Sequence, residues 1–204
     1  YSSLDRRSNR ELHQAITENM EAIAYNAKMG VPVEMNESHQ WALRYCSDVI
    51  EVAIAYITAE VAKYLGVKDM VMQYMLANPP SISPKMDLAK MQAKIELMGE
   101  LEDDAFKIFR MVRTGLLAYP ADMDKAKGLI ASTMFYGSFL KPDIIHVVSY
   151  SEAVKRATSK EILESVKIVT KSLEIAEKGL LENLHEDSEF RNRVDFLKSE
   201  VNYL

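Results

Sequence analysis

The sequence predicts an all-α fold, a helical bundle with an extended N-terminal arm and helix and with peripheral helices. Three observations predict it: apolar residues recur at helical spacing along most of the chain, helix-stop residues separate these runs, and residues 49–62 contain just three polar side chains. A helix that is apolar around most of its circumference is surrounded by neighbours. Residues 49–62 are therefore expected to lie in the central helix of the bundle.

The first half of the chain predicts three helices. Ser8 and Glu11 fit a capping box at the start of the first helix, and Gly30 supplies the left-handed residue that commonly follows a helix end. Asn36 or Ser38 caps the second helix. The expected helices span residues 9–29, 36–65 and 67–77.

The second half predicts four more helices, beginning after the proline-rich loop 78–84. Residues 144–148, Ile-Ile-His-Val-Val, have the composition of a strand. Because a lone strand has no partner, we expect a buried helical turn or connector there instead. Short connections between long helices favour antiparallel, up-down packing. The expected helices span residues 86–117, 122–139, 159–184 and 188–203.

The composition of the chain argues against several kinds of protein and site. The chain has 204 residues and a net charge of −5, and its single cysteine, Cys46, excludes a disulfide framework and a zinc site built on thiolates. The longest apolar stretch is interrupted by Glu51, Glu60 and Lys63, which favours a core helix over a membrane span. The first residue is Tyr1, so an N-terminal piece is expected to have been processed, trimmed or left out, and no signal peptide is visible in the rest.

Enzyme motifs are missing from the sequence, which has no phosphate-binding glycine loop, nucleophile elbow, Cys-x-x-Cys or His-Glu-x-x-His. Glu182 and His185 match one Glu-x-x-His pair of helical di-iron proteins, but such sites need a second pair. We therefore expect no catalysis, no cofactor, no metal and no small-molecule substrate. Arg7 and His13 have the spacing of the HEPN-type helical ribonucleases, which leaves that activity as an alternative.

Basic residues provide the candidate nucleic-acid contacts. At about 100° per residue, four lysines of the helix over 159–184 fall within roughly 40° of one another, and Arg156 extends their line to about 30 Å. A line of that length could follow nucleic-acid phosphates. The alternative is a solvated face on which Glu164 and Glu174 pair with the lysines. The candidate contacts are Lys160, Lys167, Lys171 and Lys178 with Arg156, and Arg6, Arg7 and Arg10 in the N-terminal arm.

Aromatic and methionine clusters allow two interpretations each. Trp41 and Tyr45 lie one turn apart and could stack on a ligand, although core packing is preferred. Met70, Met72 and Met75 indicate either an adaptable core or an apolar surface that faces neighbouring subunits.

The arm over residues 1–10, the stretch over 11–30 and a following helical region of similar length resemble the major coat proteins of filamentous archaeal viruses of the lipothrixvirus type. The resemblance implies a capsid protein in which residues 1–35, the arm and first helix, wrap double-stranded DNA. Residues 36–204 would form the bundle domain, which packs against copies or a sister subunit in a helical filament. It further implies a virion assembled in the host cytoplasm, and it is compatible with contact to a membrane envelope.

Two other functions stay open beside this expectation. One is a helical adaptor or small subunit of a nucleoprotein complex, which would bind one partner and form a closed assembly. The other is the HEPN-like ribonuclease introduced above.

Overall fold

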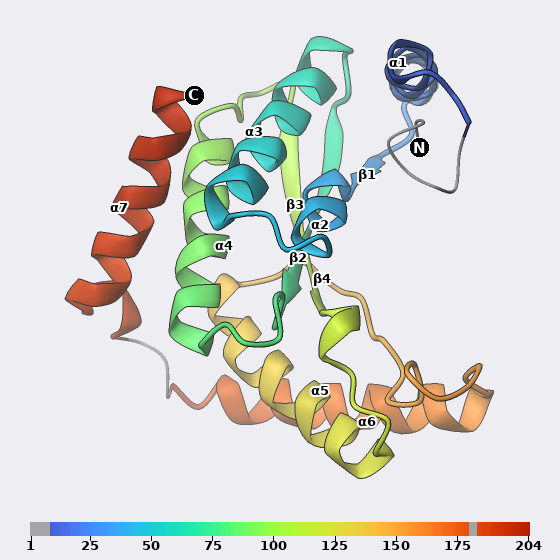
Figure 1. Cartoon of the computed structure of the whole chain (residues 1–204), viewed down its shortest axis with the longest axis vertical. Helices are drawn as coiled ribbons and strands as arrows, with labels where there is room; N and C mark the ends of the chain where they lie inside the picture. Colours follow the sequence, from blue (N-terminus) through green and yellow to red (C-terminus); the bar gives the residue numbers. More distant parts are fainter. Residues whose placement is uncertain (1–8, 180–182) are drawn as a thin grey trace.

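The protein has a mixed α/β fold, so the expected all-α bundle is wrong. The computed structural model describes residues 9–179 and 183–204. The structure is 58% helical, and its described residues contain a four-stranded parallel sheet. The strands run through the middle of the molecule, with helices beside them and at both ends (Figure 1).

The strands follow chain order across the sheet, β1-β2-β3-β4, and each neighbouring pair is parallel. Parallel neighbours need a crossover connection, which helices supply here. The strands are β1 (Val33–Met35), β2 (Asp69–Leu76), β3 (Lys107–Thr114) and β4 (Ile144–Ile145). The crossovers contain α2 (Glu37–Ala42) and α3 (Asp48–Tyr64), then α4 (Pro84–Gly99), then η1 (Leu116–Ala118), α5 (Met123–Gly137) and η2 (Ser138–Leu140).

Strand β2 lies where the sequence predicted a helix over 67–77. Between Met70 and Leu76 the one polar residue is Gln73, so the run has too little alternation to separate a buried strand from a buried helix. Pairing with β1 on one side and β3 on the other decides the conformation. That pairing joins segments more than thirty residues apart, which local periodicity does not reveal.

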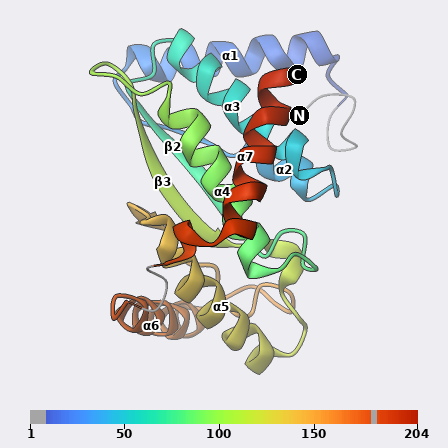
Figure 2. The same ribbon diagram turned by 90° about the vertical axis from the view of Figure 1, so that its left-hand side faces the viewer.

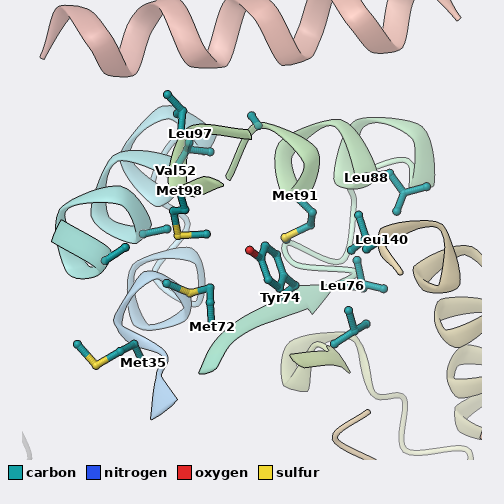
Figure 3. Packing of buried hydrophobic residues seen from close by; sticks show 14 of the residues in the cluster. Met35, Val52, Met72, Tyr74, Leu76, Leu88, Met91, Leu97, Met98 and Leu140 are labelled. Carbon is teal, nitrogen blue, oxygen red and sulfur yellow. The ribbon is translucent and has the colours of Figure 1, made fainter. Parts of the chain in front are cut away.

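The side chains of β2 form the centre of the core beneath the helices. Met72 and Tyr74 are buried, and Figure 3 shows them beside Met98 and Met91 of α4. The methionine-rich run therefore packs inside this chain, as the adaptable-core interpretation predicted. The alternative, an apolar surface facing neighbouring subunits, is wrong for these residues.

Strand β3 interrupts the helix expected over 86–117. Helix α4 ends at Gly99, and a turn follows in which the Asp103 carboxylate accepts hydrogen bonds from the backbone N–H groups of Ala105 and Phe106, at 2.8 and 2.9 Å. A side chain that bonds its own backbone in this way competes with helix continuation. The chain therefore reverses before β3.

Strand β4, Ile144–Ile145, begins the segment 144–148, for which a helical turn or connector was expected. Ile144 and Ile145 pair with Met111 and Val112 of β3. The expected turn or connector is therefore wrong for Ile144 and Ile145. The sequence offered no partner strand because β3 lies within residues for which a helix was predicted.

The helix expected over 36–65 is two helices, α2 and α3. Tyr45 has a positive φ of 57°, which breaks the helix, and the Ser47 hydroxyl then caps α3 by accepting from the N–H of Ile50. The expected boundary between residues 35 and 36 falls between β1 and α2.

Four of the expected helices are confirmed; three have ends shifted by up to three residues, and the helix expected over 159–184 ends at Ala176. They are α1 (Leu12–Lys28), α5, α6 (Ser159–Ala176) and α7 (Ser188–Tyr203), and the short η3 (Leu184–Glu186) precedes α7. Gly30 has the predicted left-handed conformation after α1, with a φ of 68°.

The helices are distributed unevenly around the sheet. α3 and α4 lie on one face, and α7 packs outside them (Figures 1 and 2). α5 and α6 pack against each other at one end of the molecule, and α1 lies at the other end, beyond the sheet as seen from α4 and α7 (Figure 2). Within the part of the chain that the structure describes, the opposite face of the sheet has no helical layer like the one that covers the first.

Candidate functional site

The carboxyl edge of the sheet is the part of this fold where a ligand site is expected. In parallel α/β structures, ligands bind outside the carboxyl ends of the strands, where the chain leaves each strand in a loop. Side chains alternate between the two faces along a strand. Val33, Met35 and Val112 belong to the core on the α3 and α4 side, so their sequence neighbours point to the opposite face.

Each strand contributes one polar residue to that opposite face, and the residues from β3 and β4 lie at its carboxyl edge. The four residues are Glu34 in β1, Gln73 in β2, Arg113 in β3 and His146 directly after β4. The strand register places Arg113 beside His146. Gln73 is level with Met111 and Glu34 with Phe109, so they lie two and four residues before Arg113 along the strand direction.

Gln73 and Glu34 form a hydrogen-bonded pair across two strands. The Gln73 Nε2 donates to Glu34 Oε1 at 2.7 Å. Gln73 is 2% exposed, whereas Glu34 reaches solvent. The buried amide therefore fixes the orientation of a carboxylate that remains accessible to a ligand.

Arg113 is a half-buried cation at this edge. Its Nε donates to the carbonyl oxygen of Thr114 at 3.4 Å, and among the described residues no carboxylate lies within ion-pair distance of its guanidinium. Burial lowers the pKa of Arg113, and the more distant Glu152 and Glu34 act against that shift. A guanidinium that has lost part of its hydration without a close counter-ion favours an incoming anion.

His146 lies beside Arg113. Its backbone N–H donates to the carbonyl of Val112 at 2.9 Å, which continues the β3–β4 ladder by one residue. Burial lowers the pKa of the imidazole, and the Arg113 guanidinium lowers it further, while Glu34 and Glu152 oppose both. The imidazole is therefore mostly neutral at pH 7, with one nitrogen able to donate a proton and the other able to accept one.

Buried ion pairs fix the residues that follow β2, on the face of the sheet covered by α3 and α4. Lys90 and Lys94 of α4 are 0% exposed, and both contact Glu51 of α3, with Lys90 Nζ 2.8 Å from its Oε2. Lys90 Nζ also donates to the backbone carbonyl of Asn78 at 2.6 Å. The ion pairs thus connect two helices to the first residues after β2.

Asp87 holds the residue just before Asn78. Its Oδ2 accepts from the N–H of Ala77 at 2.6 Å and from the Tyr136 hydroxyl at 3.2 Å. Ala77 has a positive φ of 56°, and the Asn78–Pro79 peptide bond is cis. This turn is therefore fixed by side chains from α4 and α5 rather than by its own sequence.

The predicted nucleic-acid residues lie elsewhere. Lys160, Lys167, Lys171 and Lys178 are all exposed, three of them on α6 and Lys178 just beyond its end, and Arg156 is exposed in the turn before it. Lys171 forms an ion pair with Glu174 at 2.9 Å, as the solvated-face alternative predicted.

The arginines of the arm are separated from this stripe. Arg10 is exposed and pairs with Glu18 at 2.7 Å, while Arg6 and Arg7 lie outside the described residues. α1 and α6 lie at opposite ends of the molecule in both views (Figures 1 and 2). The structure therefore does not bring Arg10 and the lysine stripe onto one local surface.

The remaining candidates are dispersed. Trp41 and Tyr45 are exposed, so the core packing preferred for them is wrong. His13 is exposed on α1, whereas its proposed partner Arg7 lies outside the described residues. His185 stacks on Phe139 with ring centroids 4.5 Å apart, and Glu182 lies outside the described part of the chain. Across residues 9–179 and 183–204, no group of three or more His, Cys, Asp or Glu side chains could hold a metal ion.

Comparison with known proteins adds no family. No protein-family model matches the chain, and no curated protein matches it significantly. None of the described helices is long and apolar enough to cross a membrane.

Sequence reasoning missed the four polar residues on this face of the sheet. The available signal was a polar residue inside or directly after a short apolar run: Gln73 within Met-Val-Met-Gln-Tyr-Met-Leu, Arg113 after Met-Val, and His146 after Ile-Ile. In a predicted helix such residues belong to a polar face. In a parallel strand they mark the site.

Proposed function

We propose that the protein binds a small anionic molecule at the carboxyl edge of its sheet, in a site suited to proton transfer. One observation carries the proposal: Arg113 and His146 lie side by side at the carboxyl ends of β3 and β4, and the Glu34 carboxylate on the same face is near enough to act on both. Together with Gln73, which donates to Glu34, they supply a guanidinium, an imidazole, a carboxylate and an amide on one face of the sheet.

The roles follow from the chemistry of the groups. Arg113 binds the anionic group, because its planar fork of donors fits carboxylate or phosphate oxygens. The neutral imidazole of His146 exchanges a proton with the bound molecule, as general acid–base catalysis requires. Glu34, oriented by Gln73, accepts a hydrogen bond from a polar group of the same molecule. The sequence predicted a protein without catalysis, and that prediction is still to be tested.

The experiment is a titration of the folded protein with inorganic phosphate and with succinate, followed by NMR. Arg113→Met should weaken binding by about tenfold or more, the loss expected for a charge-assisted bidentate contact. Lys107→Met is the matched control, because Lys107 is an exposed cation at the amino end of the same strand. Equal loss in both variants, or no binding of either anion to the unmodified protein, contradicts the proposal.

A second measurement reads His146 directly. Its imidazole should titrate below the ordinary histidine pKa in the free protein and at a higher pKa when the anion is bound, because a nearby negative charge stabilises the imidazolium. A titration that is unchanged by saturating anion would separate His146 from the site.

Coating of double-stranded DNA is a second candidate function, favoured by one observation, the exposure of the lysine stripe on and after α6. Replacing Lys160, Lys167, Lys171 and Lys178 together should flatten the salt dependence of DNA binding, since each phosphate contact contributes about −0.9 to the slope. The matched control replaces four lysines outside the stripe: Lys63, Lys68, Lys85 and Lys127. Equal slopes in the two variants would contradict a role for the stripe.

A further inference from the structure

One face of the sheet is incompletely covered. Parallel sheets occur almost only with both faces buried. Here Phe109 and Ile144, on the face opposite α3 and α4, are 38% and 39% exposed. α1 does not seal this face, because Ile23 is the one buried residue among its described residues. On the same face Gln73, Met75 and Met111 are buried within the chain, so the uncovered part is limited to Phe109 and Ile144. A cover from outside the described residues is needed there if the sheet is to be buried on both sides.

The order of the strands indicates the kind of structure that would cover Phe109 and Ile144. In an open doubly wound sheet the strand order reverses, and helices lie on both faces. The described strands instead keep the order β1-β2-β3-β4, and α3 and α4 lie on one face. This is the arrangement of half an eight-stranded βα barrel, in which helices form an outer ring and the inner faces of the strands meet in the centre.

We propose that a second copy of this chain closes the sheet into an eight-stranded parallel barrel. β4 of each copy would pair with β1 of its partner, because these two strands are the edges of the described sheet. A twofold axis along the barrel axis keeps all eight strands parallel. It also makes the two seams identical, as a symmetric dimer requires.

Charge complementarity supports a second copy as the occupant. Glu34 lies on the β1 edge and is exposed, whereas Arg113 and His146 lie toward the β4 edge. Closure brings the partner's β1, with its exposed Glu34 carboxylate, alongside β4 and toward the Arg113 guanidinium of the neighbouring strand β3. The partner would thereby contribute a carboxylate to the site formed by Arg113 and His146, a step that rests on the proposed function.

Closure also covers the apolar positions. Phe109 and Ile144 point toward the axis of the barrel, where side chains from alternate strands fill the interior in layers. The same two side chains therefore change from partly exposed to buried in the dimer. Substituting one of them should damage assembly more than it damages the folded single copy.

The first test is the mass in solution across a range of concentrations. The unmodified chain should have twice the mass of the 23.2 kDa single copy. Phe109→Asp should produce a single copy that remains folded by circular dichroism. Ile57→Asp is the matched control, because Ile57 is an exposed apolar residue on the outer helix α3, and it should remain a dimer.

The second test measures whether β4 of one copy lies next to β1 of its partner. In a Cys46→Ala background, chains carrying Glu34→Cys are mixed with chains carrying His146→Cys and treated with a short thiol cross-linker. A covalent dimer is expected from this mixture, and none from Lys107→Cys mixed with His146→Cys, since Lys107 lies at the amino end of β3.

A single copy at every concentration overturns the proposal, as does a dimer that survives Phe109→Asp but is dissociated by Ile57→Asp. Anion binding by Arg113 is measured on either species, so failure of the dimer leaves that measurement interpretable. Conversely, loss of anion binding does not alter the expected mass.

Discussion

The ammonium group of Lys90 lies 2.6 Å from the carbonyl oxygen of Asn78, and both residues are completely buried. This contact joins α4 to the turn that leaves the central strand β2. The same ammonium group is 2.8 Å from Glu51 of α3. One side chain therefore ties two helices to the edge at which the proposed site is formed.

Lys90→Met should strongly destabilise the protein. Removing one partner of a buried ion pair leaves uncompensated charge inside the protein, which costs about 3–5 kcal/mol. The free energy of unfolding in urea measures this loss. Lys171→Met removes an exposed pair with Glu174 and should cost well under 1 kcal/mol, a difference of about 2 kcal/mol or more between the variants. Similar losses of unfolding free energy in both variants would show that the buried ion pair of Lys90 stabilises the protein no more than an exposed pair does.

Asp87→Asn should remove a pH dependence of stability. Burial raises the pKa of Asp87 from 3.8 to about 6, although Lys90 opposes the shift. Between these values the folded protein holds a proton that the unfolded chain has released, so this group's contribution to stability falls as the pH rises from about 4 to about 6.

Unfolding in urea at several pH values across that window checks the prediction. The groups facing Asp87 are Lys90 of its own helix, Glu51 of α3 and Tyr136 of α5. The Asn variant should lack the fall that the unmodified protein shows. An unchanged profile would assign the pH dependence to another group.

Glu96→Gln should act in the opposite direction, at lower pH. Burial raises the pKa of Glu96, but hydrogen bonds from Arg191 and Lys198 outweigh it and hold the pKa at about 2. The resulting stability is present above the ordinary value of 4.5 and is lost as the pH falls through about 2. Acid unfolding should therefore begin from a lower plateau in Glu96→Gln and should be unchanged in Glu177→Gln, an exposed carboxylate at the end of α6.

Gly115→Ala should destabilise the carboxyl edge by backbone collision. A Cβ at Gly115 would lie 2.7 Å from the carbonyl oxygen of Leu76 and 3.1 Å from that of Ala77, and backbone has little room to move. Overpacking of this kind costs about 1–3 kcal/mol. Gly128→Ala is the matched control, because its Cβ meets nothing within 4 Å and alanine gains about 0.5–1 kcal/mol inside helix α5. Thermal unfolding should shift in opposite directions for the two variants.

The sequence by itself determined the features that depend on neighbours a few residues apart. The helices α1, α5, α6 and α7 are confirmed because apolar periodicity, capping residues and the left-handed Gly30 all act within one or two turns of the chain. The exposure of the α6 lysines likewise follows from helical spacing alone.

Tertiary structure decided the sheet, the buried ion pairs and the candidate site. β2 is apolar at nearly every position, so its conformation depends on backbone pairing with β3, which the sequence also assigned to a helix. Lys90 and Lys94 are buried because Glu51, some forty residues away, compensates their charge. Arg113 and His146 lie side by side because the parallel strands β3 and β4 align their carboxyl ends, a relationship between distant segments that no local pattern contains.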